Sequence, residues 1–404
     1  MNQSGAVAIT GLGCISTLGH DVPTNWTALS NGLSGIGNLE GFANSGLRIH
    51  SAAQVRHYTP TDHFAPADPA LLDRHSQFAL IAAREAAADA GLSESDLNNA
   101  AAVIGTGCGG KETDEQTYQR LYLDHKPRVH PFTIPRGMPS AAASQVSIQL
   151  GVRGPAFSVS SACASTNHAI SQAAIMIRSG MLDIAISGGT DAPFTYGLLK
   201  AWEAIRVLST DTCRPFSIDR DGMVLGEGAG MVILESMEHA KSRGARIYAE
   251  LAGLGMSADA AHITDPSSDG AARAMRCALA DARAKPEQIT YINAHGTGTI
   301  QNDPSETKAI RQVFGGHADD LLVSSTKSMH GHALGASGAI ELIATVLSLR
   351  HGIIPPTANF TEPGEGCSLN YVPNRPVSLD YHMALSNSFG FGGLNSVLAI
   401  RAAG

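Results

Sequence analysis

The sequence contains 404 residues, of which 43% are hydrophobic and 16% are charged, so it can bury a large core and its length suggests two to three domains. The net charge of -8 and the aromatic content of 5% argue against general affinity for nucleic acids or anionic membranes. Its six cysteines form no CxxC pair, which argues against structural zinc and a disulfide scaffold. No apolar run approaches the length of a membrane span, and the N-terminus lacks the features of a secretion signal. We therefore expect a soluble cytoplasmic protein.

The first half of the chain alternates predicted strands with predicted helices. An amphipathic helix is expected over residues 75–90, with Gly91 as its end. The expected strands cover residues 7–10, 101–104, 183–187 and 230–234. This alternation is typical of an α/β protein.

Two glycine-rich loops near the start resemble nucleotide-binding motifs only in part. Gly11-Leu12-Gly13 follows the first strand, but Ser16 stands where the dinucleotide fingerprint needs a third glycine. Residues 105–112 (GTGCGGKE) nearly match a phosphate-binding loop, but Glu112 replaces the hydroxyl that would bind Mg²⁺ and would repel phosphate. We therefore reject nucleotide binding and expect these glycines to allow close approach of the backbone.

Cys163 is the candidate nucleophile. A short β-prone run precedes it, and helical spacing begins at Ala164, with Gly180 available as a stop. At the first turn of a helix, unpaired N–H groups and the helix dipole can lower the pKa of a thiol and raise its thiolate fraction, although the sequence does not show whether the thiolate of Cys163 is preformed. The alternative is a small, buried structural cysteine, which the residue type alone favours. Three segments downstream favour the nucleophile over the structural cysteine.

The second half repeats the pattern of the first. Residues 237–246 read as a polar helix and a plausible boundary between the halves. From Ala249, AELAGLGMSAD echoes VAITGLGCIS near the start, because each places a strand before GLG and a serine soon after. The echo favours two similar α/β units.

Three loops of the second half carry the candidate partners of Cys163. His295 follows a predicted strand over 289–293, and Lys327 and His332 follow another over 321–325. A glycine-rich segment at 386–393 lies between short strands near the C-terminus. Loops at strand ends are where an α/β sheet builds an active site.

Each of these residues also has an ordinary interpretation. A single histidine in a loop is more often structural, and a single lysine is more often a solvated charge. His330 and His332 could be metal ligands, but the neighbouring sequence supplies no third ligand at a suitable spacing, so no metal is predicted.

Taken together, these segments resemble the β-ketoacyl-acyl-carrier-protein synthases of the elongating type. The resemblance rests on SACAS around Cys163, NAHGTGT around His295, SSTKSMHGHALGASGAIE around Lys327 and His332, and NSFGFGG around Phe391. The segments TGLG, RGP, RPF, DRDG and VLGEGAG also match in the family's order, so the resemblance covers nearly the whole chain.

The resemblance implies a thiolase-like α/β fold with a five-layered αβαβα core, and a dimer. Its two similar halves would be residues 1–236, which carry the nucleophilic cysteine, and residues 237–404, which carry the two histidines and the lysine. Priming synthases and thiolases place Asn or a second Cys at the position of His332, so the resemblance argues against their reactions.

The resemblance also assigns catalytic roles. Cys163 would hold an acyl group as a thioester, with the backbone N–H groups of Cys163 and Phe391 as the oxyanion hole. His295 and His332 would donate hydrogen bonds to the enolate formed when malonyl-carrier protein loses its carboxylate, and Claisen attack would give a β-ketoacyl product. Lys327 would order the site together with Glu341. No metal or cofactor is expected, because the phosphopantetheine arrives on the acyl carrier protein.

Binding roles follow from the same resemblance. Thr297 and Thr299 would hold the pantetheine arm, and Phe391 would gate the passage between the acyl pocket and the malonyl site. Cys108 would line the acyl pocket. The basic residues expected to meet the acidic carrier protein are Arg74, Arg128 and Arg206.

Some positions depart from the pattern of housekeeping synthases. Residues 164–166 (Ala-Ser-Thr) follow the nucleophile where a glycine is usual, and Cys108 replaces a larger aliphatic residue of the acyl pocket. The loop between Ser209 and Arg214 is also shorter than expected. A smaller side chain at Cys108 would admit longer, rigid or unsaturated chains. We therefore expect a specialised type II polyketide-like or aryl-polyene pathway, with a chain-length-factor homologue as partner.

Three alternatives stay open from the sequence. The chain could be a housekeeping fatty-acid elongation synthase that forms a homodimer. It could be a non-catalytic pairing subunit in which Cys163 is vestigial. It could also hydrolyse thioesters with a Cys-His pair, although two histidines without a clear acidic partner fit decarboxylation better.

Overall fold

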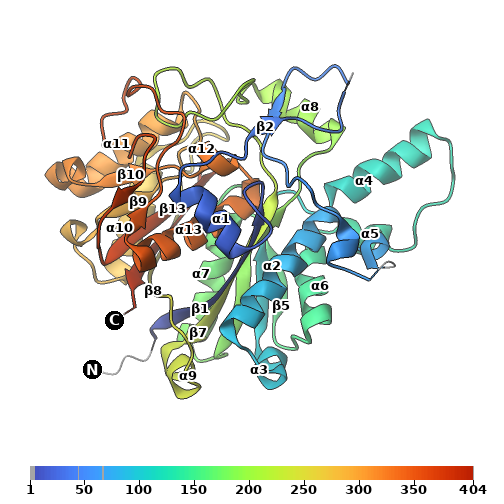
Figure 1. Ribbon diagram of the computed structural model, residues 1–404, viewed down its shortest axis with the longest axis horizontal. Helices are drawn as coiled ribbons and strands as arrows, with labels where there is room; N and C mark the ends of the chain where they lie inside the picture. The colour runs from blue at the N-terminus through green and yellow to red at the C-terminus, as the bar shows by residue number, and fades with distance from the viewer. Residues whose placement is uncertain (1–4, 44, 66–67, 404) are drawn as a thin grey trace.

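The computed structural model describes residues 5–43, 45–65 and 68–403; residues 1–4 of the first predicted half and residue 404 of the second lie outside it. Its centre is a ten-stranded mixed sheet in the order β10-β9-β13-β14-β8-β1-β7-β6-β4-β5 (Figure 1). The strands are β1 (Val7–Ser16), β4 (Ala101–Gly105), β5 (Ala156–Val159), β6 (Ile184–Asp191), β7 (Gly228–Ser236), β8 (Ala249–Ala258), β9 (Tyr291–Asn293), β10 (Leu322–Ser324), β13 (Met383–Gly390) and β14 (Leu394–Ala402). Two short ribbons pair β2 (Gly37–Asn38) with β3 (Ser51–Ala52) and β11 (Ile353–Ile354) with β12 (Val377–Ser378).

The sheet consists of two half-sheets with the same topology. Outward from β1 the order is β7, β6, β4 and β5, and outward from β8 it is β14, β13, β9 and β10. In each half the first two pairings are antiparallel and the last two are parallel. The halves meet where residues 7–9 of β1 pair with residues 249–251 of β8. The expectation of an α/β fold built from two similar units is therefore confirmed, while the boundary at 236/237 stays a prediction.

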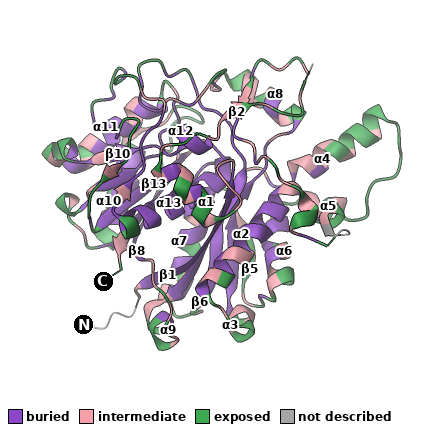
Figure 2. Cartoon of the chain, viewed as in Figure 1, coloured by how far each residue is buried: buried purple, intermediate pink, exposed green. Residues whose placement is uncertain are grey.

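Helices complete the layers around the half-sheets. Two buried helices, α7 (Ser165–Arg178) and α13 (Ser337–His351), lie in the middle, where each contacts strands of both halves (Figure 2). The outer faces are covered by α2 (Arg74–Ala90) and α6 (Ala141–Leu150) on the first half, and by α10 (Ser268–Asp281) and α11 (Asn302–Phe314) on the second. The remaining α-helices of the described residues are α1 (Val22–Ser30), α3 (Glu94–Asn99), α4 (Lys111–Tyr118), α5 (Thr133–Gly137), α8 (Tyr196–Ile205), α9 (Met237–Ser242) and α12 (Lys327–His330). This arrangement gives the five layers that the resemblance implied.

The two GLG segments lie inside strands and explain the echo between the halves. β1 does not end at Thr10 as predicted but continues to Ser16. A Cβ atom on Gly13 would lie 1.9 Å from the carbonyl oxygen of Ala82 in α2, and one on Gly255 would lie 1.9 Å from that of Ala274 in α10. Each glycine therefore lets a helix lie directly against its strand.

Other element ends differ from the predictions by a few residues. The strand predicted over 183–187 extends to Asp191, because residues 188–191 continue to pair with β7. The helix predicted over 237–246 ends at Ser242, ahead of Gly244, whose φ is +66°. The helix predicted over 75–90 is confirmed as α2, which ends at Gly91 with φ of +64°. Among the described residues, no helix combines the length and the apolar character needed to cross a bilayer.

Candidate active site

Cys163 lies in a tight turn between β5 and α7. The preceding residue, Ala162, has φ of +52°, a left-handed conformation that is uncommon for a residue other than glycine. Ser165 holds this turn, because its hydroxyl donates to the Ala162 carbonyl at 2.6 Å and accepts from the Ser161 N–H at 2.8 Å. α7 begins at Ser165, so Cys163 precedes the helix instead of lying in its first turn as predicted.

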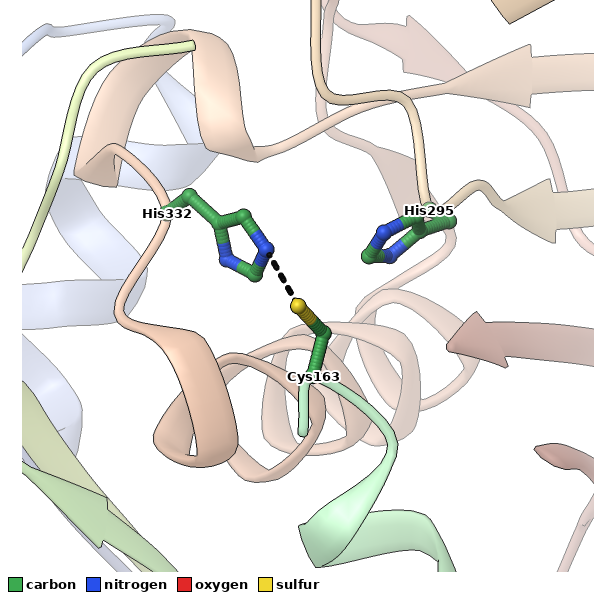
Figure 3. A group of neighbouring side chains, drawn as sticks. All are labelled: Cys163, His295 and His332. Carbon is green, nitrogen blue, oxygen red and sulfur yellow. Dashed lines mark hydrogen bonds between the residues drawn. The ribbon is translucent and has the colours of Figure 1, made fainter. Parts of the chain in front are cut away.

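Two histidines from the second half lie beside the Cys163 sulfur (Figure 3). The Nε2 atom of His332 is 3.1 Å from the Cys163 Sγ atom. The ring of His295 lies nearly perpendicular to that of His332, with 5.4 Å between their centroids. All three side chains are buried. The structure thus brings together three of the residues selected from the sequence, although they lie in three separate segments.

The backbone fixes which nitrogen of His332 carries the proton. The N–H group of Leu334 donates to the Nδ1 atom of His332 at 3.2 Å, and the Ser337 hydroxyl lies 2.9 Å from the same atom. Because a backbone N–H can only donate, Nδ1 is an acceptor and the neutral ring carries its proton on Nε2. Burial, and then the charge of Lys327, lower the pKa of His332 well below its usual value, so the ring is neutral. His332 therefore presents an N–H donor to the cavity.

His295 is held by a buried carboxylate. Glu306 accepts the backbone N–H groups of His295 and Gly296, both at 2.8 Å, and also the Asn387 side-chain amide at 3.0 Å. Burial, Lys327 and His332 lower the pKa of His295 well below its usual value. The site therefore contains two neutral imidazoles. The positioning role of Glu306 was not predicted, because only the fold shows which strand-end loop its carboxylate supports.

Lys327 and Glu341 form an ion pair in which both side chains are fully buried. Lys327 begins α12 and Glu341 lies in α13, so the pair joins the histidine-bearing loop to the central helix layer. Burial raises the pKa of Glu341 to about 7, while Lys327 acts in the opposite direction. The positive charge of Lys327 also favours a thiolate at Cys163.

The Cys163 thiol is not activated in the way the sequence suggested. Burial raises its pKa to about 11, and the carboxylate of Asp191 adds to this effect, although Lys327 and the backbone N–H groups of Phe391 and Cys163 oppose it. The prediction of a lowered pKa is therefore wrong, because the sulfur is desolvated and lies outside the helical turn. At neutral pH the resting group is a thiol. The same two N–H groups are those expected to form the oxyanion hole.

A cavity of about 400 Å³ connects this cluster to the surface. Its buried lining includes Cys163, His295 and His332, and its exposed lining includes Ile263 and Ile300. The residues predicted to hold the pantetheine, Thr297 and Thr299, also line it, with 2.9 Å between their hydroxyl oxygens.

Two aromatic rings that lie close to each other line the cavity that also contains Cys163. Phe391 follows β13, and its ring centroid lies 5.8 Å from that of Trp202 in α8. Trp202 was not selected from the sequence, because nothing in the amphipathic pattern of its helix distinguishes a cavity residue from a core residue. Cys108 does not line this cavity; it packs in the adjoining apolar cluster with Leu199, Met223 and Trp202.

The three arginines selected for carrier binding have different surroundings. Arg206 is exposed and lines the cavity. Arg128 is exposed on the segment before α5 and does not line the cavity. Arg74 is paired with Glu227 at 2.9 and 2.7 Å and packs on Phe78, so its role as a free docking charge is not supported. Its partner lies 153 residues away in the sequence, which hid the pairing.

The cluster also has the composition of a metal site. One ligand atom from each of Cys163, His295 and His332 lies within 4.8 Å of the others. His330, considered from the sequence as a ligand together with His332, is not part of this cluster and contacts the Thr326 hydroxyl at 3.0 Å. Since the Nδ1 atom of His332 accepts a backbone hydrogen bond, its Nε2 atom offers a proton and not a free lone pair. This tautomer suits a hydrogen-bond donor better than a metal ligand.

Comparisons with known proteins agree with this geometry. Residues 4–240 match the family model "Beta-ketoacyl synthase, N-terminal domain", and residues 248–361 match "Beta-ketoacyl synthase, C-terminal domain". The chain is 48% identical over 397 residues to nodulation protein E of Rhizobium sp. (strain N33), covering 98% of each chain. It is 42% identical over 410 residues to 3-oxoacyl-(acyl-carrier-protein) synthase 2 of Staphylococcus aureus (strain COL), covering 99% of each. Among solved structures, the ishigamide ketosynthase/chain length factor has a TM-score of 0.93 and 38% identity, covering 99% of both chains.

Proposed function

The chain belongs to the β-ketoacyl synthase family, whose members are acyltransferases that form carbon–carbon bonds, and we propose that it condenses an acyl group held on Cys163 with a malonyl group delivered by an acyl carrier protein. The observation that carries this proposal is the Cys163 sulfur 3.1 Å from the Nε2 atom of His332, next to a second neutral imidazole in one buried cavity. In a protease-like Cys-His pair the histidine acts as a base that takes the proton of the thiol. Here His332 instead presents its own N–H proton to the sulfur.

In the first step Cys163 takes the acyl group. Its sulfur attacks the thioester carbonyl, the bond from that carbonyl to the carrier sulfur breaks, and the thiol proton passes to the departing sulfur. The backbone N–H groups of Cys163 and Phe391, which both favour a negative charge on the Cys163 sulfur, would donate to the developing oxyanion. Because the resting thiol has a raised pKa, the charge of Lys327 supports formation of the thiolate.

In the second step the malonyl group loses its carboxylate. The bond to the carboxylate carbon breaks, CO₂ leaves, and the electron pair forms an enolate on the thioester. His295 and His332 donate N–H groups to the enolate oxygen, and neutral rings suit this role because they stabilise the charge without transferring a proton. The enolate carbon then attacks the Cys163 thioester, and the Cys163 sulfur leaves as a thiolate that takes up a proton from water to restore the resting thiol. This sequence calls on no metal or cofactor of the protein, because decarboxylation supplies the carbanion.

The approach of the carrier protein follows from the cavity. Thr297 and Thr299 place two hydroxyl groups along the path to Cys163, where amide groups of a pantetheine arm would pass. Arg206 lies on the same path and offers a positive charge to an acidic carrier. The Staphylococcus aureus relative carries the acyl-carrier-protein substrate in its name, which supports the same partner here.

We further propose a specialised polyketide-like or aryl-polyene pathway for this chain. The small Cys108 side chain lies in the apolar cluster beside the cavity, which leaves more room than a larger aliphatic residue would. The similarity to a ketosynthase/chain length factor structure also supports a specialised pathway. The 42% identity to a 3-oxoacyl synthase keeps housekeeping elongation as the alternative.

Intact-protein mass spectrometry tests the reaction and the pathway together. Carrier proteins bearing saturated, polyene or aryl-polyene groups of similar length are mixed with the purified chain. We expect a mass gain on Cys163 that is faster with the conjugated groups, because the small Cys108 side chain would let the apolar cluster beside the cavity accommodate a rigid chain. Cys163→Ala is the control and should show no gain. Cys108→Ile should remove the preference while leaving saturated chains active. Equal rates with saturated chains in the unmodified protein would refute the specialised pathway.

A second subunit is expected to cover one edge of the sheet. β5 is an edge strand, and its residue Phe157 is 37% exposed. The segment from α4 to α5 carries apolar side chains in solvent, including Tyr122 at 69% and Ile134 at 72% exposure. An open edge with exposed apolar groups nearby favours association. We therefore propose a dimer whose second subunit is a chain-length-factor homologue.

Native mass measurement of the co-expressed complex decides the identity of that subunit. We expect a complex with one copy of this chain and one homologous partner. Phe157→Lys should dissociate the complex without unfolding the chain, because the added charge would face the partner. A homodimer that is fully active with saturated acyl chains would refute the heterodimer.

A further inference from the structure

Asp191 is a buried carboxylate near Cys163 that none of the roles above uses. It ends β6 and is fully buried. Its Oδ1 atom accepts the Thr106 hydroxyl at 2.8 Å and the Cys108 N–H at 2.9 Å. Its Oδ2 atom accepts the N–H groups of Gly107 at 2.8 Å and Gly335 at 2.7 Å. Burial raises the pKa of this carboxyl group, and the same four donors oppose that rise.

These donors come from two segments that are far apart in the sequence and lie against each other at Asp191. Thr106, Gly107 and Cys108 follow β4 in the first half, and Gly335 follows His332 in the second. The contact is tight, because a Cβ atom on Gly335 would lie 2.5 Å from the Gly107 nitrogen and 2.7 Å from Asp191 Oδ2. One carboxylate therefore joins the segment of Cys108 to the segment of His332.

The link reaches the His332 ring through Leu334. Leu334 precedes Gly335 and has φ of +50°, a strained conformation for a residue with a branched side chain. In this conformation its N–H points at the Nδ1 atom of His332. Such strain persists only when the surroundings fix it, and the bond from Gly335 N–H to Asp191 is one of the contacts that do so.

We propose that Asp191 is a positioning residue that fixes the Leu334–Gly335 turn, and with it the Nε2–H tautomer of His332, while the same carboxylate holds the backbone at Cys108. Malonyl decarboxylation then depends on Asp191 although it touches no reacting atom. This inference rests on the proposed function, since it assigns His332 the role of donor to the enolate.

Asp191→Asn tests the proposal with two readouts. The amide keeps the size of the side chain but loses the charge and half of the accepting capacity, so it leaves N–H groups unpaired. Decarboxylation of malonyl-carrier protein should fall by about tenfold or more, because a misdirected donor no longer stabilises the enolate. The apparent pKa of Cys163 in iodoacetamide alkylation should fall, since the negative charge of Asp191, which raises that pKa, is removed. The other charged or titratable groups near the sulfur are Lys327, His295, His332 and Cys108.

Glu85→Gln is the matched control. Glu85 also accepts two backbone N–H groups, from Cys14 and Val22, each at 2.8 Å, and it does not line the cavity. Its substitution should lower thermal stability without moving the Cys163 alkylation profile. If Asp191→Asn matches this control in both readouts, Asp191 is only structural and the proposal is overturned. Alkylation needs no carrier-bound substrate, so a failed condensation assay with a shifted alkylation profile would count against the proposed function and leave the position of Asp191 supported.

A measurement on the unmodified protein covers the case in which Asp191→Asn does not fold. Selective ¹⁵N labelling of histidine reports which ring nitrogen carries the proton, and the His332 signals are those absent from His332→Asn. The proposal requires protonation of Nε2. Protonation of Nδ1 would overturn it.

Discussion

Replacing Cys163 with glutamine is expected to abolish condensation while malonyl decarboxylation stays unchanged or becomes faster. The substitution removes the sulfur that lies 3.1 Å from the Nε2 atom of His332, so no acyl-enzyme can form. It leaves His295 and His332 in place, and the glutamine carbonyl can accept the N–H groups of residue 163 and Phe391 as an acyl-enzyme carbonyl would. The two halves of the reaction would thus separate in one variant.

Two assays on the same preparation measure this separation. Product analysis follows growth of the acyl chain, and CO₂ release follows decarboxylation of malonyl-carrier protein. His332→Asn is the matched comparison and should lose decarboxylation by about a hundredfold, since one oriented donor to an oxyanion is typically worth that much. Loss of both activities in Cys163→Gln would show that the roles cannot be separated. Unchanged pathway output from Cys163→Ala would instead indicate a non-catalytic pairing subunit.

The shared location of His295 and Lys327 could be predicted because both follow predictable strands, whereas the roles of Phe391, Glu341, Thr297 and Thr299 were implied by the family resemblance. The ends of β9 and β10 lie side by side in a parallel pair, so His295 and Lys327 had to emerge at one edge of the sheet. The GLG segments marked the two halves, because close packing of a helix on a strand admits only glycine at those points. Such features can be predicted because they depend on residues that are close together in the sequence.

The features that decide reactivity depend on contacts between distant segments. The pKa of Cys163 is set by burial in the assembled core, which overrides the effect of a nearby helix start. The His332 tautomer depends on a hydrogen bond from the N–H group of Leu334, a residue whose positive φ its type does not favour. The pairing of Arg74 with Glu227 likewise depends on two segments that meet only in the folded chain. No local pattern contains this information.

Among the substitutions proposed for this protein, Lys327→Met is expected to lower the free energy of unfolding the most. The substitution leaves the fully buried Glu341 without its cation, and breaking a buried ion pair in this way typically costs about 3–5 kcal/mol. The double variant Lys327→Met/Glu341→Leu should recover most of that loss, because it removes both buried charges. Its condensation activity should stay low, since Lys327 no longer favours the Cys163 thiolate. Urea unfolding and acylation rates of the same variants measure the two effects.

The pH dependence of the stability of Lys327→Met shows whether the loss comes from the unpaired charge of Glu341 or from poorer packing at residue 327. Burial already raises the pKa of Glu341 to about 7 against the opposing effect of Lys327, so removing Lys327 raises it further. The folded-state pKa of Glu341 lies above its unfolded value of 4.5, so the buried group does not lower the free energy of unfolding while it is protonated. The free energy of unfolding falls as the pH rises through the folded-state pKa and the group becomes charged. The deficit relative to the unmodified protein should therefore be small near pH 5 and grow toward pH 8. A deficit that does not change across this range would show that lost packing, and not the unpaired carboxylate of Glu341, destabilises the variant.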